Sequence, residues 1–211
     1  MSTISIIGTG SMAAAIGSLA ARAGHTVEVM SRDAVKARAL AEQLGTGATA
    51  GTFSVAPAGE IVLLAVPYSA VLDVVKQYGE ELAGKLLIDI TNPVASDHIS
   101  FVTPGDSSGA QEIAKAAPAD AQVVKAFNTQ FAHVLSAGAA NGQPLDVFLA
   151  GDDVEAKARV SAFVESLGLR PMDTGSLLMA RTLEHVCLLS LGLLTHAIKS
   201  TNFAIGISLL G

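Results

Sequence analysis

The chain has 211 residues, of which 50% are hydrophobic and 15% charged, and its formal net charge at pH 7 is −6. This length and apolar content allow one large domain or two small ones around a buried core. The negative charge and the absence of a run rich in lysine or arginine argue against an extended basic surface. We therefore expect binding neither to nucleic acid nor to an anionic membrane.

The single cysteine, Cys187, has no partner for a disulfide or for a thiolate metal cluster. This favours a reducing, cytoplasmic compartment, and its apolar neighbours predict a core position rather than a reactive thiol. Residues 1–23 are apolar but lack a basic start and contain a glycine turn pattern, so we do not expect a signal peptide. The apolar run 186–198 is shorter than a bilayer requires and contains His196, which predicts a buried helix.

Short β-branched runs alternate with helical patterns from the amino terminus onward. This order predicts an α/β fold with a doubly wound parallel sheet and helices on both faces, and the unbroken apolar runs of the central strands suit a sheet covered on both sides. We expect strands at 3–7, 26–30, 60–66, 85–90 and 121–127, and helices at 11–23, 33–44, 69–78, 108–117 and 130–137.

After residue 138 the alternation continues more weakly. Two strands are expected at 145–151 and 169–175, with an amphipathic helix at 152–168 between them and a helical tail over 177–210.

The turn-rich segment 138–144 is the candidate boundary between two parts of the chain. We expect a domain of residues 1–138 and a smaller carboxy-terminal extension of residues 139–211, packed on the domain. The apolar residues of the tail recur too widely for one amphipathic face. We therefore expect the tail to be buried against a second subunit in a homodimer.

The segment "ISIIGTGSMAAAIG" places Gly8 and Gly10 directly after a strand and before a helix. Glycine at these positions lets the backbone approach a pyrophosphate, whose charge then lies at the helix amino terminus. The position in the first βαβ unit predicts a dinucleotide site; the alternative is a glycine turn used only for helix packing. Thr9 and Ser11 supply hydroxyl groups that can donate to phosphate oxygens, and Met12 is expected to pack in the helix as well as to contact the cofactor.

The end of the second strand carries positive charge. Enzymes that use NAD place an acid there, about 20 residues past the glycine loop, to bind the ribose 2′-hydroxyl. This chain has Ser31 and Arg32, with Lys36 one helical turn further, and Glu28 lies too early in the strand. A guanidinium binds a 2′-phosphate through paired, charge-assisted bonds, and an anion between two cations removes their repulsion. We predict NADP; the alternative is a solvated helix start capped by Asp33.

Five motifs follow successive strands: "GTGSMA", "SRDAVK", "AVPYSAV", "DITNPV" and "VVKAFNT". With them the chain resembles the family of coenzyme F420-dependent NADP oxidoreductases over nearly its whole length, and the NADP oxidoreductase domain of the STEAP ferric reductases is similar too. The resemblance implies a Rossmann domain with a small carboxy-terminal extension. It also implies a shallow cleft in which a deazaflavin lies against the nicotinamide.

The resemblance assigns site residues by position. For the 2′-phosphate it implies Thr9, Ser31, Arg32 and Lys36; beside the ribose and adenine, Val66, Pro67 and Tyr68, with Val71 as a further cofactor contact; and near the nicotinamide ribose, Asn92 and Pro93. The acceptor is expected beside Asn128, Thr129 and Gln130. Members close to the archaeal enzymes have histidine where this chain has Asn128, which bears on deazaflavin specificity and not on NADP.

Hydride transfer between two stacked rings depends on close range and orientation, because the cofactors supply the chemistry. A catalytic acid is therefore not required, and the sequence contains no HExxH or GxSxG motif and no Cys/His cluster. We expect no metal site, and core or interface positions for the scattered histidines. Asp89, at the end of a strand, is either a site residue or the cap of a turn.

The leading hypothesis is an oxidoreductase that passes hydride between NADP(H) and a small flavin-like acceptor, with F420 as the first candidate. A flavin or ferric reductase of the STEAP type is one alternative. An imine or hydroxyacid reductase is another, although a tail of about 35 residues is short for the helical second domain of such enzymes. A sensor that binds NADPH without turnover is the third.

Overall fold

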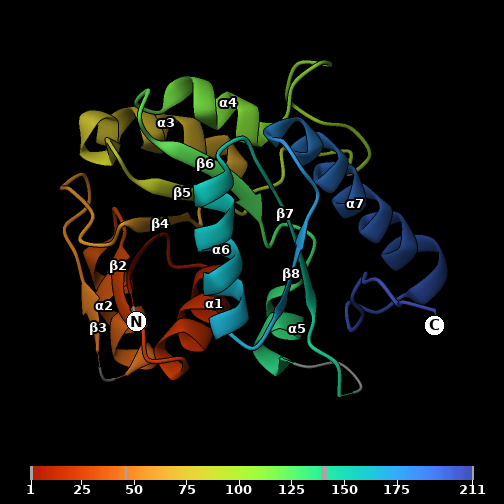
Figure 1. The fold of residues 1–211 in the computed structure, drawn as a ribbon, viewed down its shortest axis with the longest axis horizontal. Coiled ribbons are helices and arrows are strands. Elements are labelled where there is room, and N and C mark those ends of the chain that lie inside the picture. Colours follow the sequence, from red (N-terminus) through yellow and green to blue (C-terminus); the bar gives the residue numbers. More distant parts are fainter. Residues whose placement is uncertain (1, 46, 139–141, 211) are drawn as a thin grey trace.

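The computed structural model describes residues 2–45, 47–138 and 142–210, and these residues form one eight-stranded sheet flanked by helices (Figure 1). The strand order is β3-β2-β1-β4-β5-β6-β7-β8. All neighbouring strands are parallel except β6 and β7, which are antiparallel. The predicted doubly wound α/β fold is confirmed. The strands are β1 (Thr3–Ile7), β2 (Thr26–Met30), β3 (Ala48–Ala50), β4 (Ile61–Leu64), β5 (Leu86–Asp89), β6 (Gln122–Ala126), β7 (Asp146–Gly151) and β8 (Arg170–Asp173).

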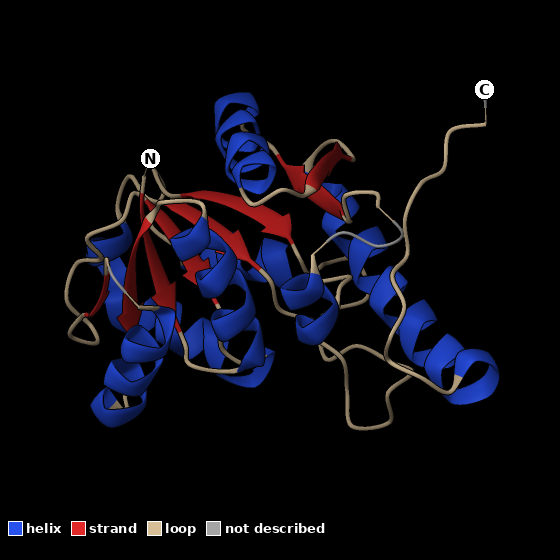
Figure 2. Cartoon of the chain, turned by 90° about the horizontal axis from the view of Figure 1, so that it is seen from below, coloured by secondary structure: helices blue, strands red, loops and turns tan. Residues whose placement is uncertain are grey.

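Helices lie on both faces of the sheet (Figure 2). Side-chain caps fix where several of them begin: Asp33 caps α2, Asp153 caps α6, and Ser108 forms a capping box with Gln111 at the start of α4. The α-helices are α1 (Ser11–Arg22), α2 (Ala34–Leu44), α3 (Tyr68–Tyr78), α4 (Gly109–Ala116), α5 (Ala132–Ala137), α6 (Val154–Ser166) and α7 (Ala180–Leu193); 3-10 turns lie at Gly79–Leu82 and Leu177–Met179, and a π-helical turn at Leu194–Ile198.

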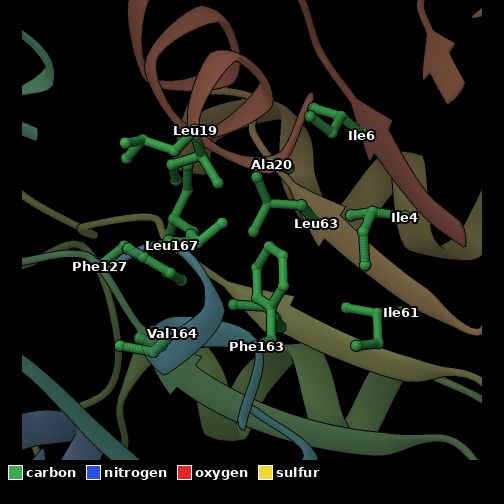
Figure 3. Close-up of a cluster of buried hydrophobic side chains, with 14 of the residues drawn as sticks. Ile4, Ile6, Leu19, Ala20, Ile61, Leu63, Phe127, Phe163, Val164 and Leu167 are labelled. Atoms are coloured by element: carbon green, nitrogen blue, oxygen red, sulfur yellow. The ribbon is translucent and has the colours of Figure 1, made fainter. Parts of the chain in front are cut away.

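The alternation of side chains along each strand divides the core into two layers. On β4, Ile61 and Leu63 point into the layer formed with α1 and α6, whereas Val62 and Leu64 point into the layer formed with α3 and α4. Phe163 of α6 lies at the centre of the first layer (Figure 3). Each fully buried aliphatic side chain contributes about 1.5–3 kcal/mol, so the central strands hold the carboxyl edge of the sheet rigidly in place.

The carboxy-terminal part of the chain adds to the same sheet. β7 pairs with β6 and β8 with β7, so this part extends the edge of the sheet. Residues 139–141, at the predicted boundary between domain and extension, lie outside the described residues. The division of the chain after residue 138 stays a prediction.

The predicted helical tail is wrong beyond residue 198. The helix ends at Ile198, because its C-cap Lys199 has a left-handed φ of 54°, and the residues that follow are not helical. They fold back onto the domain. The Ile207 N–H donates to the Asp146 carboxylate, and the Ile207 carbonyl accepts from Arg170. The Phe203 ring packs on Phe131. These long-range contacts, which have no periodic signature, replace the last helical turns.

The tail helix itself is longer than the apolar run that predicts it. By length and hydropathy alone, the continuous helical stretch of 22 residues from Leu177 to Ile198 is able to cross a bilayer, and 28% of its most apolar window is buried. Most of the residues in this window are therefore at least partly exposed in the monomer. Burial of the tail in a homodimer, the absence of membrane binding and a cytoplasmic location all stay predictions.

Candidate functional site

The glycine loop lies where β1, β4 and α1 meet. Gly8 has a φ of 131°, and a Cβ at this position would lie 2.1 Å from the carbonyl oxygen of Ala65. The fold itself therefore requires glycine at position 8. Gly10 has extended backbone, and nothing lies within 4 Å of an added Cβ. The backbone at Gly10 is therefore open to close approach, which is what binding of a pyrophosphate would require.

The amino terminus of α1 faces the same space. Gly10 occupies the cap position and supplies no side-chain acceptor, and the first turn contains no acidic residue. The free N–H groups and the helix dipole both favour a bound anion there. Ser11 is exposed at the first turn and Thr9 is half-buried beside it, whereas Met12 packs against the core.

A pocket of about 380 Å³, which we call the first pocket, opens beside the glycine loop. It lies at the carboxyl ends of β1, β2 and β4, where ligands bind in open α/β sheets. Phe53, which the sequence analysis missed, forms an apolar wall and packs edge-to-face on Tyr78 with ring centroids 5.2 Å apart. The predicted cofactor residues that line it are Gly8, Thr9, Gly10, Ser31, Arg32, Lys36, Val66 and Pro67.

The two cations of the first pocket have different partners. Lys36 Nζ lies 3.7 Å from a carboxylate oxygen of Asp33, and both side chains are largely exposed. Arg32 is exposed, and no ion pair joins it to another of the described residues. Asp33 is the α2 cap and accepts from the backbone N–H groups of Val35 and Lys36, which lower its pKa. The Arg32 guanidinium is thus free to bind an anion.

The Glu28 carboxylate is bound by other parts of the fold. One oxygen of its carboxylate accepts from the Ser5 hydroxyl at 2.5 Å and from the Ala58 N–H at 2.9 Å. A Cβ on Gly51 would lie 2.5 Å from its other oxygen. The only acid of β2 therefore faces the loops that follow β3 rather than the first pocket, and the assignment of Arg32 to the 2′-phosphate stays a prediction.

A second pocket, of about 350 Å³, adjoins the first, and the two share Val66 and Pro67. The predicted residues Tyr68 and Asn92 line it together with Thr91. Tyr68 therefore lies on the Asn92 side of the shared residues, away from Arg32. The two pockets together form an elongated cleft across the point where the strand order reverses, between β1 and β4.

Four predicted cofactor residues line neither pocket: Ser11, Met12, Val71 and Pro93. Val71 is fully buried in the layer beneath α3. Pro93 is also buried, and its carbonyl accepts from the Val102 N–H at 2.8 Å, which shapes the loop beside the second pocket.

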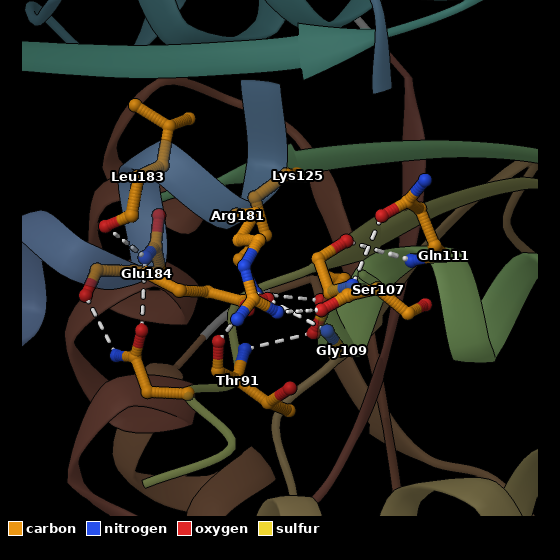
Figure 4. A network of polar contacts seen from close by, with 12 residues as sticks. Thr91, Ser107, Gly109, Gln111, Lys125, Arg181, Leu183 and Glu184 are labelled. Carbon is orange, nitrogen blue, oxygen red and sulfur yellow. Dashed lines mark hydrogen bonds and ion pairs between the residues drawn. The ribbon is translucent and has the colours of Figure 1, made fainter. Parts of the chain in front are cut away.

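Beneath the second pocket lies a buried charge network, which we define as Asp89, Lys125 and Glu184. Figure 4 shows Lys125 and Glu184 with Thr91 and Gly109. The Lys125 ammonium donates to both carboxylates at 2.8 Å and to the Thr91 carbonyl at 2.6 Å. All three side chains are fully buried. Glu184 also accepts from the Gly109 N–H at 2.9 Å. The network thus joins β5, β6, α4 and α7 under one side of the cleft.

Burial and the charges of the network shift the pKa values of Lys125, Glu184 and Tyr68. Burial disfavours the Lys125 ammonium, but the two carboxylates outweigh burial and raise its pKa. Burial raises the pKa of Glu184, while Lys125 acts in the opposite direction. Burial and the nearby carboxylates of Glu112, Glu184 and Asp89 raise the pKa of Tyr68 to about 12, so its phenol stays protonated at neutral pH.

The three predicted acceptor residues are buried in the structure. The Asn128 amide donates to Asn92 Oδ1 at 2.9 Å and to the Leu183 carbonyl at 3.0 Å, and the Asn92 amide donates back to the Asn128 carbonyl at 2.8 Å. Gln130 donates to the Asp146 carbonyl, and the buried Thr129 hydroxyl has no partner among the described residues. Asn128 therefore acts on the cleft through Asn92, and a direct acceptor contact of these side chains stays a prediction.

Lys125 and Glu184 are, like Phe53, residues near the site that were not predicted from the sequence. Asp89, which was a candidate, is fully buried and accepts from the Thr91 N–H at 2.8 Å, so it caps a turn and binds Lys125 as well. A signal was present in "VVKAF", where a lone lysine interrupts an otherwise apolar central strand. A lysine there requires a buried acid, but the sequence does not identify which one.

Other polar groups do not gather into a site. Within the described residues there is no group of three or more His, Cys, Asp or Glu side chains that could hold a metal ion. His25 is buried at the opposite edge of the sheet, where it binds Ser166 at 2.8 Å. Cys187 is half-buried, and burial raises the pKa of its thiol to about 11. A thiol with this pKa is a poor nucleophile at neutral pH.

Comparison with known proteins gives consistent matches. Residues 3–93 match the family described as NADP oxidoreductase, coenzyme F420-dependent. The chain is 32% identical over 186 residues to the metalloreductase STEAP3 of Rattus norvegicus, covering 87% of this chain and 36% of STEAP3. It is 31% identical over 140 residues to the F420-dependent NADP reductase of Methanocaldococcus jannaschii, covering 64% of this chain and 62% of that reductase.

A solved structure agrees over the full length. The crystal structure of a protein from Arthrobacter sp. FB24, provisionally named an F420-dependent NADP reductase, superposes with a TM-score of 0.86 at 30% identity. The match covers 99% of this chain and 100% of that protein. The similarity therefore includes β7, β8 and the tail helix, which lie beyond the part matched by the family description.

Proposed function

Because the chain belongs to the family of F420-dependent NADP oxidoreductases, we propose that it transfers a hydride between NADP(H) and a small ring acceptor of the deazaflavin or flavin type, with coenzyme F420 as the first candidate. The observation that carries this proposal is the cleft formed by the two adjoining pockets. Arg32 and Lys36 lie at one end and Asn92 at the other, with the glycine loop beside the first pocket.

The chain's own residues bind and orient the dinucleotide. The amino terminus of α1 takes the pyrophosphate, because its N–H groups are free and Gly10 leaves the approach open. Arg32 and Lys36 bind the 2′-phosphate, which separates NADP from NAD. When bound, NADPH supplies the hydride. The second pocket, with Tyr68 and Asn92, then holds the nicotinamide end and leaves its open side to the acceptor.

Rigid walls support the required alignment of two rings. The Asn92 amide is fixed by the Asn128 carbonyl, and its own oxygen accepts from the Asn128 amide. The Thr91 backbone is fixed on both sides, by Asp89 and by Lys125. A wall that does not rearrange favours direct hydride transfer, because no reorganisation is needed when the rings meet.

The test is an acceptor assay with the purified protein. We expect NADPH to be oxidised in the presence of F420 and NADH to be oxidised much more slowly, because only NADPH carries the phosphate that Arg32 binds. Oxidation of NADPH with FMN, FAD or a ferric chelate but not with F420 would reassign the acceptor. Tight binding of NADPH without oxidation by any of these acceptors would contradict an enzymatic role and favour a sensor.

A flavin or ferric reductase is the second candidate function. It is favoured by the similarity to STEAP3, which covers more of this chain than the match to the Methanocaldococcus jannaschii reductase does. The chain spans about a third of STEAP3, so any metal reduction by the whole of that protein does not transfer to this chain by similarity alone. The same acceptor assay separates the two candidates.

A further inference from the structure

The buried charge network lies directly beneath a residue that lines the second pocket. The Thr91 N–H donates to Asp89 and the Thr91 carbonyl accepts from Lys125, so both polar groups of this backbone segment are held by charged side chains. Ligands in the second pocket are therefore separated from these charges by Thr91. At this depth charges interact through protein rather than through water, and their effect is greater there because protein has the lower dielectric constant.

The network contains two acidic groups and one basic group, and Lys125 and the Gly109 N–H favour the ionised form of Glu184 while burial opposes it. All three side chains are fully buried. Glu184 Oε1 already accepts from both Lys125 and Gly109, whereas Oε2 is buried and has no partner among the described residues. Stability requires only one carboxylate for one ammonium, since a further buried acid costs desolvation energy. Stability alone therefore does not explain the second carboxylate.

The negative potential reaches the second pocket. Tyr68 lines this pocket, and its ring lies close to Gly109, where an added Cβ would be 2.9 Å from the ring and 3.1 Å from Glu184 Oε1. After burial, the carboxylates of Glu112, Glu184 and Asp89 are what raise the pKa of Tyr68. A group in the second pocket that gains positive charge is stabilised by the same potential that opposes ionisation of the phenol.

We propose that the paired carboxylates Asp89 and Glu184 stabilise oxidised nicotinamide in the second pocket relative to reduced nicotinamide, and so make bound NADPH a stronger hydride donor. This inference rests on the proposed function. When NADPH reacts, its C4–H bond breaks, the hydride with both electrons forms a new bond to the acceptor ring, to carbon in a deazaflavin or to nitrogen in a flavin, and the acceptor takes a proton from solvent. The nicotinamide changes from neutral to singly positive, which is the change that a buried negative charge favours.

The test compares the dissociation constants of NADP+ and NADPH in the Glu184→Gln protein. This substitution keeps the size of the side chain and an oxygen that can accept from Lys125 and Gly109. We expect the constant for NADP+ to rise about three- to tenfold and that for NADPH to change less than about twofold, because only the oxidised ring is charged. A loss of positioning alone would weaken both by the same factor.

The control is Glu60→Gln, which removes the same charge from an exposed carboxylate at the opposite edge of the sheet, where Glu60 pairs with Arg159. It should leave the ratio of the two constants unchanged. If Glu184→Gln does not fold, Asp89→Asn takes its place with the same expected ratio. An unchanged ratio in a folded variant overturns this inference, whereas failure of the unmodified protein to bind NADPH overturns the proposed function itself.

Discussion

The ammonium of Lys36 lies 3.7 Å from the carboxylate of Asp33, the residue that caps α2 at the mouth of the first pocket. Both side chains are exposed, and such pairs contribute little to stability. A phosphate can therefore replace Asp33 as the partner of the Lys36 ammonium at a small cost in free energy, while Asp33 keeps its bonds to the helix N–H groups. Before an anion binds, the Asp33 carboxylate thus balances the charge of the Lys36 ammonium in the first pocket.

Replacing Arg32 with alanine should weaken NADPH binding by about fivefold to a hundredfold, the range for loss of a charge-assisted bond. NADH binding should hardly change, since NADH has no 2′-phosphate. Titration of the two reduced dinucleotides measures both effects. Arg38→Ala is the matched control, because Arg38 is exposed on α2, the helix that follows Arg32, and lines a different depression, with Glu42. Equal losses for NADPH and NADH would contradict the assignment of Arg32.

The two loop glycines should respond differently to alanine. Gly8→Ala places a Cβ 2.1 Å from the Ala65 carbonyl at a φ of 131°, so it should destabilise the fold by roughly 3 kcal/mol or more. Gly10→Ala meets no protein atom and should leave the melting temperature nearly unchanged, while weakening NADPH binding by about tenfold or more, since the new methyl group occupies the approach of the pyrophosphate. Normal NADPH affinity in Gly10→Ala would argue against a pyrophosphate at this helix.

Local features of the sequence predict much of this site. The turn of Gly8 and Gly10, the charge at Arg32 and the strand periodicity all depend on residues near one another in the chain, and each lies at the predicted place. The three residues of β3 are too few for a periodic signal. The antiparallel pairing of β7 is not predictable in the same way, because strand direction depends on how the connection between β6 and β7 crosses the sheet.

Long-range pairing explains the main omissions. Lys125 and Glu184 are 59 residues apart in the chain and lie on a strand and a helix that have no sequence signature in common. Glu184 stands on an apolar helix, where its burial depends on the packing of α7 against α4. Likewise, the fold-back of the tail depends on Arg170 and Asp146 holding the backbone of Ile207. Such contacts follow from the tertiary structure and not from periodicity.

Asn128→His introduces the residue that the family resemblance implies at this position and should lower the free energy of unfolding by about 1–3 kcal/mol. A neutral imidazole has one N–H, whereas the Asn128 amide donates to both Asn92 and the Leu183 carbonyl, so one buried acceptor loses its partner. Urea unfolding measures the change. Thr129→Val is the neighbouring control and should be close to neutral, because the buried Thr129 hydroxyl has no partner among the described residues. Equal stability of Asn128→His and the unmodified protein would mean that the amide pair contributes little.

His25 should make the stability of the fold depend on pH. The Ser166 hydroxyl donates to the Phe163 carbonyl, so the His25 Nε2–H donates to Ser166, and His25 Nδ1 accepts from the Ser2 N–H. Burial lowers the pKa of His25 below its usual 6.5, so the fold favours the neutral ring. The stabilisation is complete above this value and is lost as the pH falls through the lower pKa of the folded state.

We therefore expect the free energy of unfolding to fall as the pH is lowered from about 7.5 to about 5.5, and to fall less in His25→Gln, which cannot take up a proton. Urea unfolding across this range measures both slopes. His196→Gln, at an exposed position near the end of the tail helix, should keep the slope of the unmodified protein. If His25→Gln loses stability on acidification as steeply as the unmodified protein does, groups other than His25 control the pH dependence, because a glutamine side chain has no proton to gain over this range.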